Sequence, residues 1–426
     1  MSIEKRIVKT QAKIEARKEN QRVNGVVTPT SKEYERHQRY ASFFRWVLSQ
    51  KLPKSECIVL GETQREDIKR ITGESPVIYA PQHSTTYDLA RDIAYVVPHA
   101  YALVGDEYTN YYTFIDPLLK FFNGRIPFDR KDAEDCQYMK EISTTILNDG
   151  YDLLLYPEGT MNFNRGVLTL YLTIIELALN SGAIIAPIGK EMHILRNKKG
   201  EVSGDISYSK YEDYHKDQTL FRPSDNIDLV RMYNHFKQIG YLEAVSNYDI
   251  DNYITANKFI LGTFTLNLED ELAEFLHTHP QLLNFFVQLN KSGNTELIGR
   301  VERYLKRCTI IKSLRKMEVA CLNILQERMG ILSNQIITEI DKRHPLSPEQ
   351  IMKNYEDYQK YFIDTHEKIS RKGRSDIYTI VDQFRNEITE EEIIERETTK
   401  VLKGLKEVIQ DDMVFDKYKI SSMILK

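Results

Sequence analysis

Short apolar runs alternate with longer amphipathic segments between residues 74 and 189, and this alternation constrains the fold more than any other feature. Each run has the length of a buried strand, and the segments between the runs have helical spacing. The runs, some with the loop that follows, are VIYAP (77–81), AYALVG (100–105), RIPFDR (125–130), YDLLLYPEGT (151–160) and AIIAPIG (183–189). Because strands alternate with helices, the expected fold class is α/β, with a mostly parallel sheet flanked by helices.

The helical spacing predicts which segments cover this sheet and how the chain is divided. The expected helices are YDLARDIAYVVPHA (87–100), YYTFIDPLLKFFNG (111–124), DAEDCQYMKEISTTILNDG (132–150) and LTLYLTIIELALNSG (168–182). After about residue 215 the strand signals fade and helical spacing dominates. A chain of 426 residues is too long for one compact core. The expected domains are a basic helical N-terminal arm (1–73), an α/β domain (74–215) and a large C-terminal helical domain (216–426).

The N-terminal region is basic, with twelve Lys and Arg against five Glu in residues 1–53. Thr30 and Glu33 form a capping-box pattern, which predicts a helix that starts there and ends by Pro53. This helix carries Trp46, the only Trp of the chain, among basic residues. It is therefore expected either to lie on an anionic membrane surface or to pack on the next domain with its charges in water.

Composition excludes several classes of protein. The net charge of −4 disfavours a dedicated nucleic-acid binder. The four cysteines are far apart and form no CxxC pair, which argues against a zinc knuckle and a disulfide framework and favours a reducing, cytoplasmic location. The most apolar stretch, residues 166–189, contains polar breaks and is better explained as a buried helix and strand than as a membrane span. Peripheral attachment to the inner face of the membrane remains compatible with this expectation.

The segment HSTTYD holds the first candidate for chemistry. It follows the first predicted strand, so His83 is expected at the carboxyl edge of a parallel sheet, where ligands bind in such folds. Asp88 lies about one helical turn further on, and its carboxylate can reach back to one imidazole nitrogen. That contact would leave the other nitrogen free to accept a proton. In isolation, the pattern is more typical of a structural histidine than of a catalytic one.

Further polar residues occur at other predicted strand–loop junctions. Arg125 and Arg130 flank the third run, Glu158 and Gly159 follow the fourth, and Pro187 closes the fifth. If these loops gather at one edge of the sheet, they supply cations, a carboxylate and a glycine backbone beside the histidine. Such a set suits attack of a hydroxyl on an activated acyl group, with an anionic headgroup held by arginine.

Four stretches, in this order, resemble the conserved blocks of the glycerolipid acyltransferase family, which includes the lysophosphatidate and glycerol-3-phosphate acyltransferases. They are HSTTYD, GRIPFDR, YPEGTMN and IIAPIG, and the resemblance covers residues 74–215. The resemblance implies that His83 is the base that deprotonates the acceptor hydroxyl and that Asp88 orients it. It also implies that Arg130, with Arg125, binds the phosphate of the acceptor.

The remaining roles follow from the same resemblance. Glu158, the backbone of Gly159 and Thr160 would bind the glycerol part of the acceptor, and Pro187 would shape the site for the acyl donor. No metal and no bound cofactor are implied. The partners would be an acyl donor, either acyl-CoA or an acyl carrier protein thioester, and a glycerol-phosphate-type acceptor. The basic residues 1–53 would meet an anionic membrane surface or an acidic carrier protein.

The chain departs from the family pattern after the Glu-Gly-Thr block. Met161 and Asn162 stand where the family usually has Arg and Ser, so Arg165 is considered as a replacement for the missing cation. Pro127 stands where a large apolar residue is common. These departures leave two alternatives open: an acyltransferase for a soluble, non-glycerolipid alcohol, and a non-catalytic scaffold that binds a membrane surface or a partner.

Overall fold

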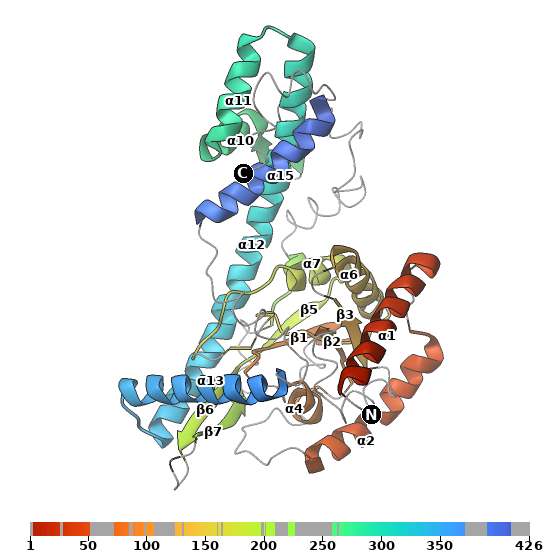
Figure 1. Ribbon diagram of the computed structural model, residues 1–426, viewed down its shortest axis with the longest axis vertical. Helices are drawn as coiled ribbons and strands as arrows, with labels where there is room; N and C mark the ends of the chain where they lie inside the picture. The colour runs from red at the N-terminus through yellow and green to blue at the C-terminus, as the bar shows by residue number, and fades with distance from the viewer. Residues whose placement is uncertain are drawn as a thin grey trace. The chain divides into compact units, whose positions relative to one another are not determined.

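The computed structural model divides into two compact units that differ from the three expected domains (Figure 1). Unit 1 comprises residues 1–224 and 320–385, and unit 2 comprises residues 225–319 and 386–426. The N-terminal arm therefore belongs to the same unit as the sheet, and the expected C-terminal helical domain is split between the units. The structure describes residues 3–25, 29–51, 72–84, 88–97, 99–105, 124–129, 132–159, 161–162, 165–196, 200, 202–208, 220–225, 258–261, 264–370 and 390–409.

Unit 1 contains a five-stranded sheet in the order β3-β2-β4-β1-β5, and all neighbouring strands are parallel. This confirms the predicted fold class. The strands are β1 (Val77–Pro81), β2 (Tyr101–Gly105), β3 (Arg125–Phe128), β4 (Leu153–Leu154) and β5 (Ile184–Ile188). Because β1 and β4 are neighbours in this order, the loops that follow them leave the same edge of the sheet side by side.

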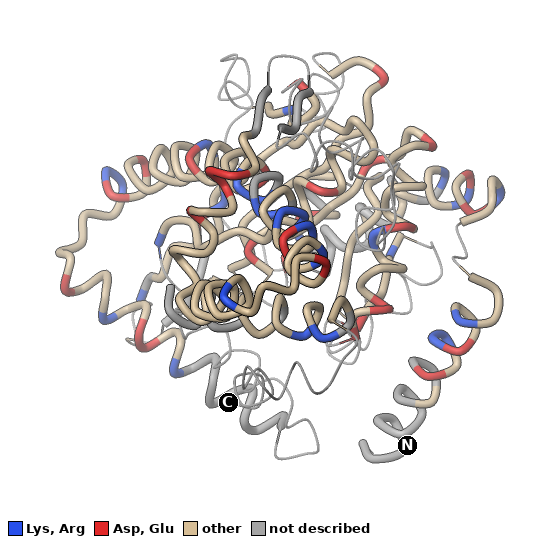
Figure 2. The backbone as a smooth tube through the Cα atoms, turned by 90° about the horizontal axis from the view of Figure 1, so that it is seen from above, with Lys and Arg blue, Asp and Glu red and all other residues tan. Residues whose placement is uncertain are grey.

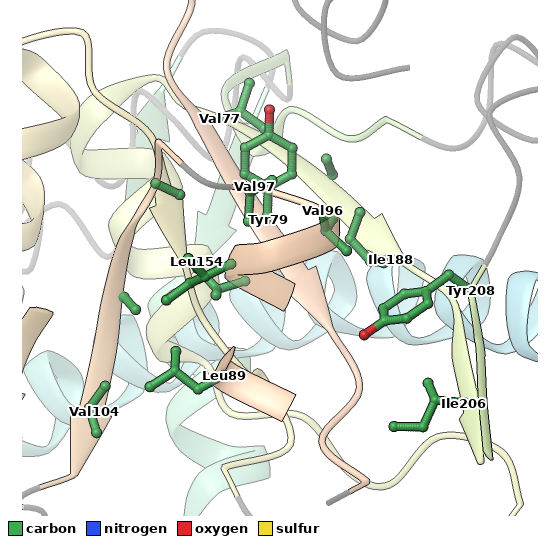
Figure 3. Close-up of a cluster of buried hydrophobic side chains, with 14 of the residues drawn as sticks. Val77, Tyr79, Leu89, Val96, Val97, Val104, Leu154, Ile188, Ile206 and Tyr208 are labelled. Atoms are coloured by element: carbon green, nitrogen blue, oxygen red, sulfur yellow. The ribbon is translucent and has the colours of Figure 1, made fainter. Parts of the chain in front are cut away.

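The two faces of the sheet are covered by different helices. Alternate residues of β1, Val77 and Tyr79, belong to a buried cluster with Leu89 of α4 (Asp88–Tyr95), as the period of two in a strand requires (Figure 3). The helices α6 (Ala133–Asn148) and α7 (Thr173–Ser181) lie on the other side of the sheet (Figure 1). The helix expected at 111–124 lies outside the described residues.

Two antiparallel strand pairs were not expected. In unit 1, β6 (Lys190–Arg196) pairs with β7 (Val202–Tyr208), and Ile206 and Tyr208 extend the cluster around α4 (Figure 3). In unit 2, β8 (Lys258–Leu261) pairs with β9 (Phe264–Asn267), which corrects the purely helical reading of residues 216–426. The alternation of apolar and polar residues in β7 was a signal in the sequence, whereas β8 and β9 have only four residues each and give a weak one.

The other described elements are mainly helical. In unit 1 they are α1 (Ile3–Asn24), α2 (Ser31–Lys51) and α13 (Pro348–Ser370); in unit 2 they are α10 (Leu268–Thr278), α11 (Pro280–Lys291) and α15 (Glu390–Ile409). The short 3-10 helix η3 (Pro223–Asp225) has residues in both units. The helix α12 (Thr295–Arg343) contributes residues to both units. Unit 2 has its own apolar core, which includes Phe285 of α11, Leu305 of α12 and Leu402 of α15. Within the described residues, no helix has an apolar stretch long enough to cross a membrane.

The N-terminal helices pack on the α/β domain. The capping box is present: the backbone N–H of Thr30 donates to Glu33 Oε2 (2.8 Å), and the N–H of Glu33 donates to Thr30 Oγ1 (3.4 Å). Tyr34 of α2 is buried and donates to Asp149 at the end of α6. In α1, Arg17 pairs with Asp135 at 2.6 Å. The helix that follows Thr30 therefore packs on the α/β domain, which is one of the two arrangements expected for it.

Part of the basic charge of the N-terminal region is therefore neutralised within the chain. Lys and Arg alternate with Asp and Glu along the described helices, α1 included (Figure 2). Lys18 lies 2.8 Å from Asp129, the residue that follows β3. Further along, Phe43 and Trp46 of α2 are more than half exposed, with ring centroids 6.1 Å apart. Two adjacent apolar rings on a basic helix are typical of a membrane-facing surface.

The core of the sheet yields a prediction of stability. Leu154 of β4 is fully buried in the cluster that Figure 3 shows. We expect Leu154→Ala to destabilise the protein by about 2–5 kcal/mol because it opens a cavity between sheet and helix. Thermal melting measures this, with Met352→Ala as the control because Met352 of α13 is 63% exposed. Equal melting temperatures for the two variants would contradict the assignment of Leu154 to the core.

Candidate active site

The predicted histidine–aspartate pair is formed. His83 follows β1, and Asp88 is the first residue of α4. The distance from His83 Nδ1 to Asp88 Oδ2 is 2.9 Å, and the same oxygen accepts from the backbone N–H of Ser84. Asp88 is fully buried, whereas the His83 side chain is 12% exposed. Because a carboxylate only accepts, the imidazole proton is on Nδ1, and Nε2 keeps its lone pair.

Glu158 fixes the backbone of the histidine. It follows β4 and is 1% exposed. Its Oε2 accepts from the backbone N–H of His83 (3.1 Å), and its Oε1 accepts from the backbone N–H of Leu168 (2.8 Å) and from Asn162 Nδ2 (3.1 Å). Burial raises the pKa of Glu158 to about 7, although these three donors lower it. The structure thus shows Glu158 as a bridge between two loops, while the contact with the acceptor that the resemblance implies stays a prediction.

The two departures from the family pattern have structural roles. Asn162 is buried, and its backbone N–H donates to the carbonyl oxygen of His83. Together with Glu158, it holds both backbone polar groups of His83. Met161 is 6% exposed and packs against Tyr358 of α13. At this position the chain therefore has an apolar contact and no cation.

Gly159 is required by its own surroundings. Its φ is +63°, and a Cβ there would lie 2.5 Å from Tyr171 Cε2. A side chain would therefore meet both backbone strain and a clash. The close approach that the sequence predicted is to Tyr171. Thr160, the next residue of the block, lies outside the described residues.

Of the predicted cations that the structure describes, Arg125 lies away from His83 and Arg165 is paired with a carboxylate. Arg125 is the first residue of β3, and the pairing places it level with Tyr79 in the middle of β1. It lies four residues before the level of His83, or roughly 13 Å along the strand direction. Arg165 donates through both terminal nitrogens to Asp341 of α12, at 3.0 and 2.8 Å. Arg130 lies outside the described residues.

Pro187 is buried in β5, opposite Ala80 of β1. As β5 is an edge strand of the sheet, the missing N–H of proline is tolerated there.

Gln82 follows β1 and joins two other segments. Its Oε1 accepts from the backbone N–H of Lys190 (3.1 Å), and its Nε2 donates to the Gly166 carbonyl (2.8 Å). The carboxylate of Glu191 accepts from the backbone N–H of Gly166 (3.1 Å).

Sequence reasoning missed three residues beside the pair. The ring of Tyr156 stacks on the His83 ring, with centroids 4.6 Å apart. Lys190 is fully buried with its Nζ 3.3 Å from Asp88 Oδ2 and 2.9 Å from Asp92 Oδ2. The i, i+4 spacing of Asp88 and Asp92 in DLARD was a signal in the sequence, because it puts both carboxylates on one helix face. Lys190 lies far away in sequence, and no local pattern indicates its partners.

This arrangement can perform acid–base chemistry. A buried carboxylate orients the imidazole and stabilises its protonated form, and Nε2 can take a proton from a hydroxyl group. Within the described residues, no accepting or donating group contacts that nitrogen. Nor does any group of three His, Cys, Asp or Glu side chains in the described part of the chain have the arrangement of a metal site.

Three comparisons with known proteins bear on the family of this chain. A family model described as Acyltransferase matches residues 60–191. The chain is 28% identical over 124 residues to a 1-acyl-sn-glycerol-3-phosphate acyltransferase of Haemophilus influenzae, which is 29% of this chain and 50% of that protein. The chain thus spans about half the length of the curated relative it matches. The crystal structure of the 1-acyl-sn-glycerophosphate acyltransferase PlsC from Thermotoga maritima aligns at 11% identity with a TM-score of 0.26, over 50% of this chain and 96% of that one.

The buried carboxyls behind the sheet edge predict how stability depends on pH. Burial raises the pKa of Glu191, like that of Glu158, to about 7. The folded state therefore holds protons that the unfolded state releases above about 4.5, so stability falls as the pH rises from about 4.5 to 7. Each carboxyl contributes a loss of about 3 kcal/mol over this range.

We expect Glu191→Gln to remove the part of this pH-dependent loss of stability that Glu191 contributes. Between pH 5 and pH 8, the melting temperature of the variant should fall by less than that of wild type. The amide oxygen can still accept from Gly166, Gln82 and Ser333, which all donate to one oxygen of Glu191. If both proteins lost the same amount, Glu191 would already be ionised at pH 5.

Proposed function

We propose that residues 60–191, which match a family model described as Acyltransferase, form an acyltransferase domain, and that the protein transfers a fatty acyl group from a thioester to a hydroxyl group. The proposed acceptor is of the glycerol-phosphate type, such as lysophosphatidate. The observation that carries the proposal is the 2.9 Å contact between His83 Nδ1 and the fully buried Asp88, which leaves Nε2 available. Both residues lie within the matched region.

In the proposed reaction, the acceptor hydroxyl donates its proton to His83 Nε2 as its oxygen attacks the thioester carbonyl carbon. The new carbon–oxygen bond forms the ester, and the carbon–sulfur bond breaks. The imidazolium then returns the proton to the departing sulfur, which leaves as a thiol. Asp88 stabilises the imidazolium between these steps, and the contacts of Glu158 and Asn162 with the His83 backbone hold the ring in place.

Acyl-CoA and an acyl carrier protein thioester both remain proposed donors. For the phosphate of the acceptor, Arg130 remains the candidate from the sequence. Arg91 of α4, one turn after Asp88, is a further candidate because it is buried and its Nε and Nη1 have no hydrogen-bond partner within the described residues. Arg165 is a weaker candidate, since its guanidinium is paired with Asp341.

A neutral alcohol is the second candidate acceptor. The observation that favours it is the burial of Met161 against Tyr358, at the position where a cation was expected. We also propose that the protein contacts a membrane surface peripherally through residues 1–53. The exposed rings of Phe43 and Trp46 support that part of the proposal.

The first test measures thiol release. Palmitoyl-CoA and palmitoyl acyl carrier protein serve as donors, with lysophosphatidate, glycerol-3-phosphate, monoacylglycerol or no acceptor. We expect acceptor-dependent release that falls about 10³-fold in His83→Ala, because the general base is lost. His277→Ala is the control, since His277 is exposed on α10.

The acceptors distinguish the candidates. Release with lysophosphatidate but not with monoacylglycerol supports a phosphate-bearing acceptor, and the reverse supports a neutral alcohol. A His83→Ala variant that keeps the wild-type rate would exclude His83 as the base.

A second test concerns Glu158. In Glu158→Gln one carboxylate oxygen becomes an NH2 group that faces a backbone N–H donor, so one of the two loop contacts is lost. We expect kcat to fall by about 10–100-fold, because displacement of the base by a fraction of an ångström slows the reaction. Glu191→Gln is the matched control, as its carboxylate is also buried but receives its donors on one oxygen.

The kinetic constants separate this role from the one implied by the resemblance. Loss of a contact with the acceptor would raise the KM for the acceptor and leave kcat nearly unchanged. That outcome would assign Glu158 to substrate binding and contradict its role in positioning His83.

A further inference from the structure

Lys190 is a charged residue in a position where charge is costly. It is the first residue of β6, immediately after the Gly that follows β5, and its side chain is fully buried. A buried ammonium is tolerated only when carboxylates or other acceptors surround it. Its placement in the core beside His83 therefore calls for an explanation from its contacts.

The ammonium of Lys190 shares an acceptor with the imidazole. Its Nζ lies 3.3 Å from Asp88 Oδ2, and His83 Nδ1 lies 2.9 Å from the same oxygen. The ammonium of Lys190 and the imidazole N–H of His83 thus compete for one carboxylate oxygen of Asp88. A cation this close to Asp88 weakens the attraction that Asp88 exerts on a proton at His83.

A second carboxylate balances the ammonium. Asp92 Oδ2 accepts from Lys190 Nζ (2.9 Å) and from Tyr156 OH (2.8 Å), and its Oδ1 accepts from Tyr208 OH (2.6 Å). Burial and the Asp88 carboxylate raise the pKa of Asp92, whereas Lys190 and Tyr208 lower it. Burial has the largest effect, so the pKa of Asp92 is raised overall, and the three donors act against this rise by stabilising the carboxylate.

The groups that bond within this cluster come from one helix, two strands and two loops. Asp88 and Asp92 lie on α4, Lys190 on β6 and Tyr208 on β7, and Tyr156 and His83 lie on the loops after β4 and β1. Glu158 also acts on Lys190 through its charge. With His83 neutral, the two aspartates and the lysine sum to one negative charge, and protonation of His83 brings the cluster to neutrality.

We propose that Lys190 and Asp92 form a positioning pair that sets the pH at which His83 loses its proton, by controlling how much of Asp88 is available to the imidazole. Lys190 competes with His83 for Asp88, and Asp92 limits this competition by neutralising Lys190. The inference rests on the proposed function, in which His83 must be unprotonated to accept a proton.

Three variants test the pair because they shift the balance in opposite directions. Lys190→Met removes the competing cation, so the pH midpoint of His83 should rise by about one unit. Asp92→Asn leaves Asp88 as the carboxylate paired with Lys190, so the midpoint should fall by about one unit. The double variant removes a cation and an anion together, so its midpoint should lie between those of the single variants, close to wild type.

The readout is the rate at which diethyl pyrocarbonate modifies His83, followed by mass spectrometry of the peptide between pH 5 and pH 9. This reagent reacts with the unprotonated ring, so the rate reports the proton on His83 without any substrate. Lys306→Met is the matched control. Lys306 is a buried lysine in unit 2 that pairs with Glu302 at 2.7 Å, and its loss should leave the midpoint unchanged.

The outcomes separate tuning from a merely structural role. A distorted site would change the modification rate at every pH and leave the midpoint where it is. Unchanged midpoints, or shifts of the same sign in both single variants, would overturn the proposal. If Lys190→Met does not fold, Asp92→Asn and the double variant still give the comparison, since neither leaves an extra buried carboxylate.

The same readout distinguishes this proposal from the proposed function. Opposite shifts without thiol release from any donor and acceptor pair would uphold the tuning of His83 and contradict acyl transfer. Acyl transfer that depends on His83, with midpoints that do not move, would uphold the function and overturn the role of Lys190.

Discussion

The carboxylate of Glu158 joins the loop after β1 to the loop after β4, and the placement of His83 depends on this contact. One oxygen receives the backbone N–H of His83, and the other receives that of Leu168. Asn162 completes the arrangement by donating to the His83 carbonyl. Because the carboxylate is buried, no water is present to accept from these N–H groups if Glu158 moves. A displacement of the Glu158 side chain would therefore release the backbone of His83.

Basic and acidic side chains alternate from the histidine toward the core. His83, Asp88, Lys190 and Asp92 follow one another within hydrogen-bonding or ion-pairing distance, and hydroxyl groups close the inner end. Each buried charge thus has an opposite charge or a polar partner beside it, which offsets the cost of removing it from water. This arrangement makes the proton affinity of the outermost residue sensitive to groups that no substrate touches.

The last third of the chain contributes to the same unit as the sheet. Asp341 of α12 receives Arg165, Ser333 of α12 bonds with Glu191, and Tyr355 of α13 donates to the Met192 carbonyl at 2.7 Å. Met161 packs against the same helix α13. Met161, which stands where a cation was expected, therefore contributes to the packing of α13.

The sequence by itself determined the parallel α/β fold, because strands buried on both faces give continuous apolar runs separated by helical spacing. It also determined that His83 and Asp88 meet, since a strand end and a helix start five residues apart bring their side chains together. Only the tertiary structure decided that Glu158 holds the histidine backbone, that Arg165 is paired, and that Lys190 lies against Asp88. Those contacts join residues distant in sequence, and their partners are selected by strand order and register, which no local pattern encodes.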